Sequence, residues 1–327
     1  MIKSMYMSNK FQDAEISEIM VNTGQHYDFN MDGAFHTKSP DYTLNIRHEN
    51  PNQFLTDVQI GLERITRIKD IDGILVYGDT ISTLAGALFA NKHNKKLFHI
   101  EAGLRSGDSS MPEEIVRIMT DMLAYRNYCP SSNAVKNLVL EGLNGICTGD
   151  ILVEIFNTNT QKIENTNKHY VLATIHRKEN TDNLANLRSI LKNLSALAQS
   201  KKIVMPIHPR TKRIIEEQSL YTGQIEAIDP VDLDTMYTLL CGCDFVVTDS
   251  GGLQREAYLA GKECFVVRAS NEWDDLLNFG NQSLITVNSN NPFITFHKKN
   301  RPCQKGLLGD GKASQYIIED IKKVLGS

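Results

Sequence analysis

The chain contains 327 residues, 41% of them hydrophobic, and carries a formal net charge of −4. This length is sufficient for two domains of ordinary size, each with its own core. The charge provides no global basic field for nucleic acid, and no apolar stretch is long enough to predict a membrane span. The N-terminal residues lack the apolar core and cleavage site of a signal peptide, so we expect a cytoplasmic protein.

Six cysteines occur in the chain, and their spacing matches neither a zinc ribbon nor a zinc finger. Cys241 and Cys243 lie close together, at the end of a predicted helix and the start of a strand, without partner ligands nearby. We therefore interpret them as buried free thiols and predict no metal site.

Short apolar runs alternate with amphipathic helical patterns along the whole chain, which is typical of a parallel α/β protein. In the first half, the apolar runs predict strands at residues 19–22, 73–77, 97–100 and 127–129. The patterns between them predict helices at residues 53–68, 82–93, 113–124 and 133–141.

The second half repeats this alternation. We predict its strands at residues 170–174, 203–206, 225–228, 245–248 and 264–267. Helices are predicted at residues 184–198, 211–217, 233–240 and 253–260, with a last helix at 313–325.

A polar segment at residues 157–168, rich in Asn, Thr, Gln and Lys, predicts a linker or a surface segment. It separates an N-terminal domain, residues 1–156, from a C-terminal domain, residues 169–312. The remaining residues, 313–327, form a helix that can pack back on the N-terminal domain. Two doubly wound sheets would place ligand-binding loops at the carboxyl ends of their strands, in a cleft between the domains.

The most informative motif follows the predicted strand at 245–248 and reads Thr248-Asp249-Ser250-Gly251-Gly252-Leu253-Gln254-Arg255-Glu256. A strand, a Ser-Gly-Gly turn and a helix aim several backbone N–H groups and a helix dipole at one point, which suits a phosphate. Glu256 lies one turn into the helix, where a carboxylate can accept from the two hydroxyls of a ribose. The alternative is an ordinary turn in which Ser250 caps the helix.

Acidic residues follow two successive strands of the first half. Asp79 comes after the strand at 73–77 and Glu101 after the strand at 97–100, so both should emerge at the same sheet edge. Farther along, Glu113 and Arg117 share one helix face at i,i+4. Such a cluster suits proton abstraction beside a diphosphate leaving group.

Each of these residues also has a simpler interpretation. Asp79 can cap the following helix. Glu101 can pair with Arg105, and Glu113 with Arg117, as surface ion pairs that contribute little to stability.

Cationic side chains follow strands of the second half. His208, with Arg210 close by and a helix beginning after it, fits an anion site. His176 and Arg177 also follow a strand, and they fit a phosphate contact and structural hydrogen bonding equally well.

Taken together, these loops resemble the non-hydrolysing UDP-N-acetylglucosamine 2-epimerase family. The matching segments are 23–28, 76–80, 99–105, 111–114, 176–180, 206–209, 248–254 and 309–313. They occur in the family's order and span nearly the whole chain. The resemblance implies two Rossmann-like domains of the glycosyltransferase-B type, a UDP-sugar in the interdomain cleft, and a homodimer.

The resemblance also implies a reaction and its residues. Family members eliminate UDP across C1 and C2 to an enzyme-bound glycal and add it back with the C2 proton on the opposite face. Neither a metal nor a nicotinamide cofactor is needed. The catalytic residues implied are Asp79, Glu101, Glu113 and His208. The substrate-binding residues implied are Lys3, Arg117, Arg177, Ser250, Gly251, Gly252 and Glu256, and Gln25 and His26 keep a second, allosteric UDP-sugar site open.

The chain departs from the family pattern in two places. Family members begin with an apolar strand and a Gly-x-Arg-Pro loop, whereas this chain begins at Met1-Ile2-Lys3, just after that loop. We expect a start upstream of Met1, because a sheet without an interior strand would expose apolar surface; a truncated copy is the alternative. The second departure is Asn271, where the family usually has Thr before the Glu of a loop that borders the sugar.

We therefore predict a UDP-N-acetylglucosamine 2-epimerase that forms UDP-N-acetylmannosamine and feeds surface-polysaccharide precursors. The alternative sugars are a UDP-diacetamido-uronate and a 6-deoxy N-acetyl sugar, because the Asn271 loop leaves the substrate open. A hydrolysing epimerase, a glycosyltransferase of the same two-domain shape and a truncated, inactive UDP-sugar binder are the other interpretations.

Overall fold

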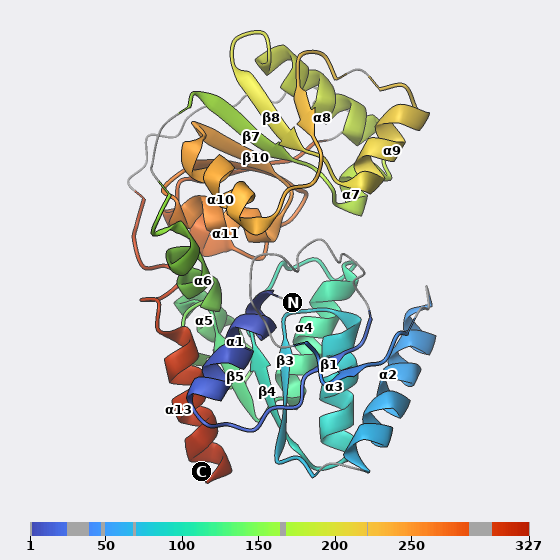
Figure 1. The fold of residues 1–327 in the computed structure, drawn as a ribbon, viewed down its shortest axis with the longest axis vertical. Helices are drawn as coiled ribbons and strands as arrows, with labels where there is room; N and C mark the ends of the chain where they lie inside the picture. The colour runs from blue at the N-terminus through green and yellow to red at the C-terminus, as the bar shows by residue number, and fades with distance from the viewer. Residues whose placement is uncertain are drawn as a thin grey trace. The chain divides into compact units, whose positions relative to one another are not determined.

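The computed structural model describes residues 2–24, 39–46, 50–67, 70–163, 168–220, 222–287 and 303–326 (Figure 1). The chain forms two compact units. The N-terminal unit comprises Met1–Ile155 and Leu308–Ser327, and the C-terminal unit comprises Phe156–Leu307. The last helix, α13 (Ala313–Leu325), thus belongs to the N-terminal unit.

The N-terminal unit is built on a parallel four-stranded sheet with the order β3-β4-β5-β6. Its strands are β3 (Gly73–Tyr77), β4 (Lys96–Ile100), β5 (Arg126–Cys129) and β6 (Ile146–Cys147). The first three confirm the predicted strands. The prediction at 19–22 is only partly right: β1 (Val21–Asn22) pairs with β2 (Tyr42–Thr43) in a separate sheet among the described residues.

Helices cover both faces of this sheet. They are α1 (Ile2–Asp13), α2 (Pro51–Thr66), α3 (Ile81–Lys92), α4 (Pro112–Leu123), α5 (Ser132–Leu140) and the start of α6 (Ile151–Thr160), with α13. Alternating side chains of β4 separate the faces, because Phe98 packs with α1 and α13 while Leu97 packs with α3. By this alternation His99 points to the same face as Leu97.

Helix α6 corrects the predicted linker. The helix continues to Thr160, and the Thr160 hydroxyl donates to the backbone carbonyl of Phe156 at 2.8 Å. Residues 157–160, the start of the segment that suggested a linker, are therefore helical, because they continue a helix that begins in the apolar run at Ile151.

The C-terminal unit contains a parallel six-stranded sheet with the order β12-β11-β10-β7-β8-β9. Its strands are β7 (Tyr170–Thr174), β8 (Lys202–Pro206), β9 (Glu226–Ile228), β10 (Phe245–Thr248), β11 (Glu263–Val267) and β12 (Gln282–Ile285). All except β12 were predicted. The chain winds away from β7 in both directions, so the strand order reverses between β7 and β10, and this is where doubly wound sheets bind ligands.

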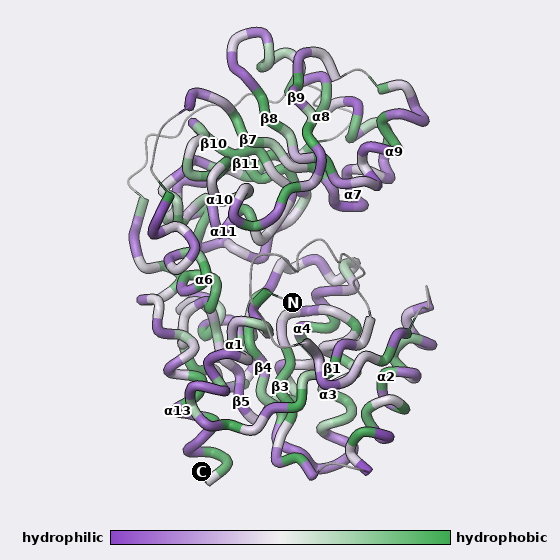
Figure 2. The backbone as a smooth tube through the Cα atoms, viewed as in Figure 1, coloured by the Kyte–Doolittle hydropathy of each residue, from purple (hydrophilic) through white to green (hydrophobic). Residues whose placement is uncertain are grey.

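Its helices again lie on both faces of the sheet. They are α7 (Lys178–Thr181), α8 (Leu184–Leu197), α9 (Pro209–Glu217), α10 (Leu233–Gly242), α11 (Gly251–Leu259) and α12 (Asp274–Phe279). Val171 of β7 packs with α8, whereas Leu172 packs with α10 and α11. Central strands such as β3, β7 and β8 are coloured largely as hydrophobic along the backbone, as expected for parallel sheets covered on both faces (Figure 2). The chain therefore has the predicted α/β fold with two Rossmann-like halves.

The structure also bears on the two cysteines and on membrane-spanning segments. Cys243 is buried and Cys241 partly buried, and both are free thiols. Within the same residues, no helix combines the length and apolarity that crossing a membrane requires.

Gly103, in the turn after β4, provides a stability test of this fold. Its φ is +78°, and a Cβ added there would lie 2.3 Å from the Ala134 carbonyl oxygen of α5. We expect Gly103→Ala to lower the free energy of unfolding by about 3 kcal/mol or more, because backbone strain and a clash add together. Urea denaturation followed by circular dichroism measures this loss.

Gly142 is the matched control, since its φ is +76° but a Cβ there meets nothing within 4 Å. Gly142→Ala should cost only the left-handed backbone penalty, about 1–2 kcal/mol. An equal loss of unfolding free energy in Gly103→Ala and Gly142→Ala would contradict the close packing of Gly103 against Ala134.

Candidate active site

Asp79 and Glu101 emerge from neighbouring strands at one edge of the N-terminal sheet. Strands β3 and β4 pair in parallel with Tyr77 opposite Ile100, so the two loops begin at the same level. The Gly78 N–H donates to the Ile100 carbonyl at 2.9 Å and joins the loops directly. The structure thus places Asp79 and Glu101 at the same sheet edge, as predicted.

Glu101 adopts an unusual backbone conformation. Its φ is +73°, in the left-handed region, which costs a non-glycine residue about 1–2 kcal/mol. The N–H groups of Glu101 and Ala102 both donate to the Tyr128 carbonyl at 3.1 Å and hold this conformation. Strain of this kind is concentrated at functional sites.

The Glu101 carboxylate pairs with Lys3 of α1, and the Lys3 ammonium also lies 2.7 Å from Asp150 Oδ1. The simpler interpretation of a Glu101–Arg105 ion pair is therefore wrong, because Arg105 pairs with Asp121 and Glu141 instead. Lys3 therefore lies between Asp150 and Glu101, the residue to which the resemblance assigns a catalytic role.

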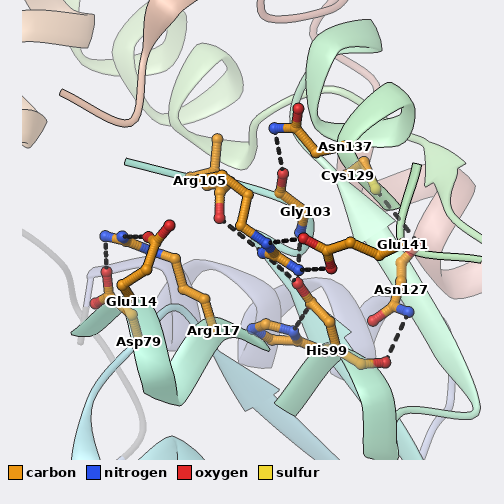
Figure 3. A network of polar contacts seen from close by, with 12 residues as sticks. Asp79, His99, Gly103, Arg105, Glu114, Arg117, Asn127, Cys129, Asn137 and Glu141 are labelled. Carbon is orange, nitrogen blue, oxygen red and sulfur yellow. Dashed lines mark hydrogen bonds and ion pairs between the residues drawn. The ribbon is translucent and has the colours of Figure 1, made fainter. Parts of the chain in front are cut away.

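Arg117 joins Asp79 to Glu114 (Figure 3). The Arg117 side chain is only 4% exposed and pairs with Asp79 on one side, and it donates to Glu114 Oε2 at 3.0 Å on the other. Two simpler interpretations are thereby wrong. Thr80 rather than Asp79 caps α3, and the acid paired with Arg117 is Glu114, one turn away at i,i+3, rather than Glu113.

Glu114 anchors the loop that follows Glu101. Its carboxylate accepts from the backbone N–H and hydroxyl of Ser106 and from the backbone N–H of Gly107, at 2.9 to 3.0 Å. Burial works to raise the pKa of Glu114, but these hydrogen bonds and Arg117 outweigh it, so the pKa is lowered. Its neighbour Glu113 is exposed at the start of α4.

A buried aspartate of α4 that the sequence analysis did not identify organises the same region. Asp121 accepts from His99 Nδ1 at 2.7 Å, from the Gly103 N–H at 3.1 Å and from Arg105 at 2.7 Å. Burial works to raise the pKa of Asp121, but His99 and Arg105 outweigh it and lower that pKa. The buried face of α4 is largely polar, with Glu114, Arg117, Thr120 and Asp121, so no apolar periodicity in the sequence marked Asp121 as a core-facing residue.

In the C-terminal unit, Asp249 holds the two loops at the point where the strand order reverses. It is fully buried and accepts from the backbone N–H groups of His176 and Arg177, at 3.1 and 2.9 Å, and from the Asn180 amide at 3.0 Å. One carboxylate thus connects the loop after β7 to the loop after β10.

The Ser-Gly-Gly segment forms the N-terminus of α11. The Ser250 hydroxyl accepts from the Leu253 N–H at 3.3 Å, so Ser250 caps the helix, and Gly251 and Gly252 are its first residues. The N–H groups of first-turn residues have no partner within a helix and attract anions. The predicted strand, turn and helix are therefore confirmed, and capping by Ser250 is compatible with an anion in front of the helix.

Two histidines follow strands β7 and β8, close to the place where the strand order of the C-terminal sheet reverses. The His176 and His208 ring centroids are 6.3 Å apart. His208 Nδ1 accepts from the Arg210 N–H at 3.2 Å, which assigns the proton of a neutral ring to Nε2. Burial lowers the pKa of His176, and the nearby Arg177 and His208 act in the same direction, against the opposing effect of Asp249.

The remaining predicted residues divide between described and undescribed parts of the chain. Glu256 is 9% exposed on α11, and its carboxylate accepts from the Tyr237 hydroxyl at 3.2 Å. Gln25 and His26 lie outside the described residues. Across the described ranges, no group of three or more His, Cys, Asp or Glu residues is arranged to hold a metal ion.

The loop after β11 contains Asn271, which the sequence analysis singled out, together with Arg268 and Glu272. Arg268 is fully buried and donates to Glu272 at 2.7 Å, while its Nε and Nη2 atoms have no hydrogen-bond partner among the described residues. The amide of Asn271, 5% exposed, is likewise without one. Glu272 lies against the start of α11, because a Cβ on Gly251 would be 3.1 Å from its Oε1.

The lowered pKa of Glu114 predicts how stability depends on pH. Its folded pKa lies below the ordinary value of 4.5, so its contribution is fully present above that value and is lost as the pH falls through the folded pKa. We expect Glu114→Gln to cost about 2 kcal/mol at neutral pH. This cost should shrink steadily below about pH 4, as urea denaturation over a pH series would show.

The control is Glu226→Gln, which removes an exposed carboxylate paired with Lys202 at 2.8 Å. It should change stability by less than about 1 kcal/mol at every pH. A loss of stability in Glu114→Gln that does not change with pH would contradict the lowered pKa of Glu114.

Comparison with known proteins agrees with this geometry. A family model described as UDP-N-acetylglucosamine 2-epimerase matches residues 9–322. A UDP-N-acetylglucosamine 2-epimerase homolog from Methanococcus maripaludis is 35% identical, with 94% of this chain and 92% of that protein covered. A UDP-2,3-diacetamido-2,3-dideoxy-D-glucuronate 2-epimerase from Pseudomonas aeruginosa is 36% identical over the same shares.

Among solved structures, the Methanocaldococcus jannaschii UDP-GlcNAc 2-epimerase in complex with UDP-GlcNAc and UDP superimposes with a TM-score of 0.86. It is 29% identical, and the match covers 98% of this chain and 96% of that one. Sequence and fold therefore agree over nearly the whole length, and the chain belongs to the UDP-N-acetylglucosamine 2-epimerase family.

Proposed function

We propose that the protein is an isomerase that interconverts UDP-N-acetylglucosamine and UDP-N-acetylmannosamine. The observation that carries this proposal is the pair of carboxylates, Asp79 and Glu101, at one sheet edge of a chain that belongs to this family. A glycosyltransferase of similar architecture has no need of two carboxylates that handle a proton at C2.

The reaction requires one group to remove the C2 proton and another to return a proton to the opposite face. In the first step the C2–H bond breaks, a C1=C2 double bond forms, and the C1–O bond releases UDP. In the second step C2 takes a proton from the other face and a phosphate oxygen of UDP bonds to C1 again. We assign these proton transfers to Asp79 and Glu101, with Glu113 as a further candidate.

Cations beside both carboxylates favour their charged forms. Arg117 pairs with Asp79, and Lys3 pairs with Glu101. An ionised carboxylate is the form that can accept the C2 proton. We therefore propose that Lys3 and Arg117 keep the bases ionised in the free enzyme and stay close to the reacting sugar.

The C-terminal unit supplies groups that suit the leaving UDP. The N-terminus of α11, with Gly251 and Gly252, attracts a diphosphate, and the Nε2–H of His208 is oriented by its capping bond as a further donor. We propose that Arg177 adds positive charge there. We further propose that Glu256, one turn farther along α11, accepts from the ribose hydroxyls.

A second substrate has its own support. The Pseudomonas aeruginosa relative is named for a UDP-diacetamido-glucuronate, and Asn271 presents a buried amide without a hydrogen-bond partner among the described residues. A UDP-2,3-diacetamido-2,3-dideoxyglucuronate is therefore the alternative sugar to test alongside UDP-N-acetylglucosamine.

A proton NMR time course in D₂O tests the proposed activity. With UDP-N-acetylglucosamine we expect deuterium at C2 and UDP-N-acetylmannosamine, without accumulation of free UDP. Free N-acetylmannosamine with UDP would indicate a hydrolysing enzyme. Exchange only with the diacetamido-uronate would identify the alternative substrate, and no exchange with either would overturn the proposal.

Replacement of Glu101 tests its role in the same assay. Glu101→Gln keeps the shape of the side chain but cannot accept the proton, so turnover should fall about 10²–10⁴-fold. Glu226→Gln, on the exposed end of β9, should leave turnover unchanged. A Glu101→Gln variant with wild-type turnover would exclude Glu101 as a base.

We also propose that the protein forms a homodimer. Ile115, Met119 and Met122 form an apolar stripe along α4 with exposed fractions of 43%, 38% and 67%. Val139 and Leu140 at the end of α5 are 62% and 77% exposed. Large exposed apolar side chains in such numbers are typical of an interaction surface.

Charge placed on this surface should separate the subunits. We expect Met122→Asp combined with Leu140→Asp to produce a folded monomer in size-exclusion chromatography with light scattering, because a buried carboxylate opposes association. Ile60→Asp on α2, at a site that is 43% exposed, serves as the control and should leave the dimer intact. A wild-type protein that is already monomeric would contradict this proposal.

A further inference from the structure

His99 is a buried histidine whose two ring nitrogens both face hydrogen-bond acceptors. Its Nδ1 lies 2.7 Å from Asp121 Oδ1 and its Nε2 lies 2.9 Å from the Gly78 carbonyl oxygen. The side chain is fully buried. A carbonyl oxygen only accepts, and an ionised carboxylate only accepts, so both bonds exist together when the ring carries a proton on each nitrogen.

The charges around His99 are arranged to support this state. Asp121 is fully buried and its Oδ2 also accepts from the Gly103 N–H and from Arg105, and these contacts favour the ionised, accepting form of the carboxylate. Arg105 in turn donates to both oxygens of Glu141 at 2.7 Å. With a proton on each ring nitrogen of His99, cations and anions alternate along this series of contacts (Figure 3). Burying charges is costly, so we interpret this network as a device that specifies the geometry of the loops rather than as a source of stability.

The two ends of this network attach to the two loops that carry the carboxylates. Gly78, which receives the Nε2 bond, immediately precedes Asp79. Gly103, whose N–H donates to Asp121, follows Glu101 by two residues and has a left-handed φ that keeps the turn tight. A single imidazole therefore connects, through one aspartate, the turn before Asp79 with the turn after Glu101.

We propose that His99 is a positioning residue that holds the Asp79 and Glu101 carboxylates at the separation needed to exchange the C2 proton between the two sugar faces. The proposal rests on the proposed function. His99 acts through Gly78 and, by way of Asp121, through Gly103, and it does not contact the sugar. A misplacement of about 1 Å at reacting groups lowers rates about 10²-fold, which sets the scale of the effect.

The test compares His99→Gln with the wild-type protein. One glutamine amide nitrogen cannot reach both Asp121 and Gly78, so one of the two loops is released. We expect kcat and C2 deuterium exchange to fall about 30- to 100-fold. KM for the UDP-sugar and the Kd for UDP, measured calorimetrically, should change less than about threefold, because the diphosphate groups of the C-terminal unit are untouched.

Tyr170→Phe is the matched control for a purely structural effect. Tyr170 is the first residue of β7, at the end of the strand away from the loops that follow it, and its buried hydroxyl donates to the Leu239 carbonyl at 2.6 Å. This variant should lower the melting temperature while kcat stays at the wild-type value. A folded His99→Gln variant with wild-type kcat, or an equal loss of kcat in Tyr170→Phe, would overturn the proposal.

Ring NMR of the wild-type protein tests the same idea without a variant that must fold. Nitrogen-15 labelling of histidine should show, for His99, one proton on each ring nitrogen, both protected from solvent. A single ring proton would overturn the proposal even if His99→Gln does not fold. If the wild-type protein exchanges no sugar proton, that result counts against the proposed function. The ring-proton measurement then tests the contacts of His99 independently of activity.

Discussion

Buried aspartates determine the conformation of the loops on which both units depend. Parallel strands end in loops whose backbone N–H groups point away from the sheet and need acceptors. Asp249 provides them for His176 and Arg177, and Asp121 provides one for Gly103. A carboxylate can accept several such bonds at once, and each bond favours its ionised form. The loops are thereby fixed by groups that never need to touch a substrate.

This arrangement changes the role of the cations in the N-terminal unit. The resemblance assigned Lys3 and Arg117 to the substrate, where they would add positive charge beside the diphosphate. In the structure each bridges two acids: Lys3 lies between Glu101 and Asp150, and Arg117 lies between Asp79 and Glu114. Removing either cation would leave carboxylates facing each other in a partly buried environment, which is more costly than the loss of one surface ion pair. Their first role is therefore to hold acids together.

The sequence predicted those parts of the site that follow from local rules. Asp79 and Glu101 were placed correctly at one edge because polar residues after parallel strands meet there, and Ser250 was placed at the helix start because Ser-Gly-Gly follows an apolar run.

The partners of the charged side chains were not predicted. Which acid Arg117 contacts depends on the turn of α4 that packs on β4, and sequence spacing allowed Glu113 and Glu114 equally. Asp121 was missed for the same reason, since its donors lie 16 to 22 residues away along the chain. The strand β12 was missed because Gln282 and Ser283 are polar although buried.

The left-handed backbone at Glu101 has a consequence for how this protein can change over evolutionary time. Glycine would occupy that position without strain, and asparagine with little, so the residue that best suits the fold is not the one that bears a carboxylate of this length. Selection for stability alone would favour replacement of Glu101, whereas the proposed role of Glu101 in turnover would retain it. A descendant of this chain relieved of its activity should therefore accumulate glycine or asparagine at this position early, before changes reach the sheet itself.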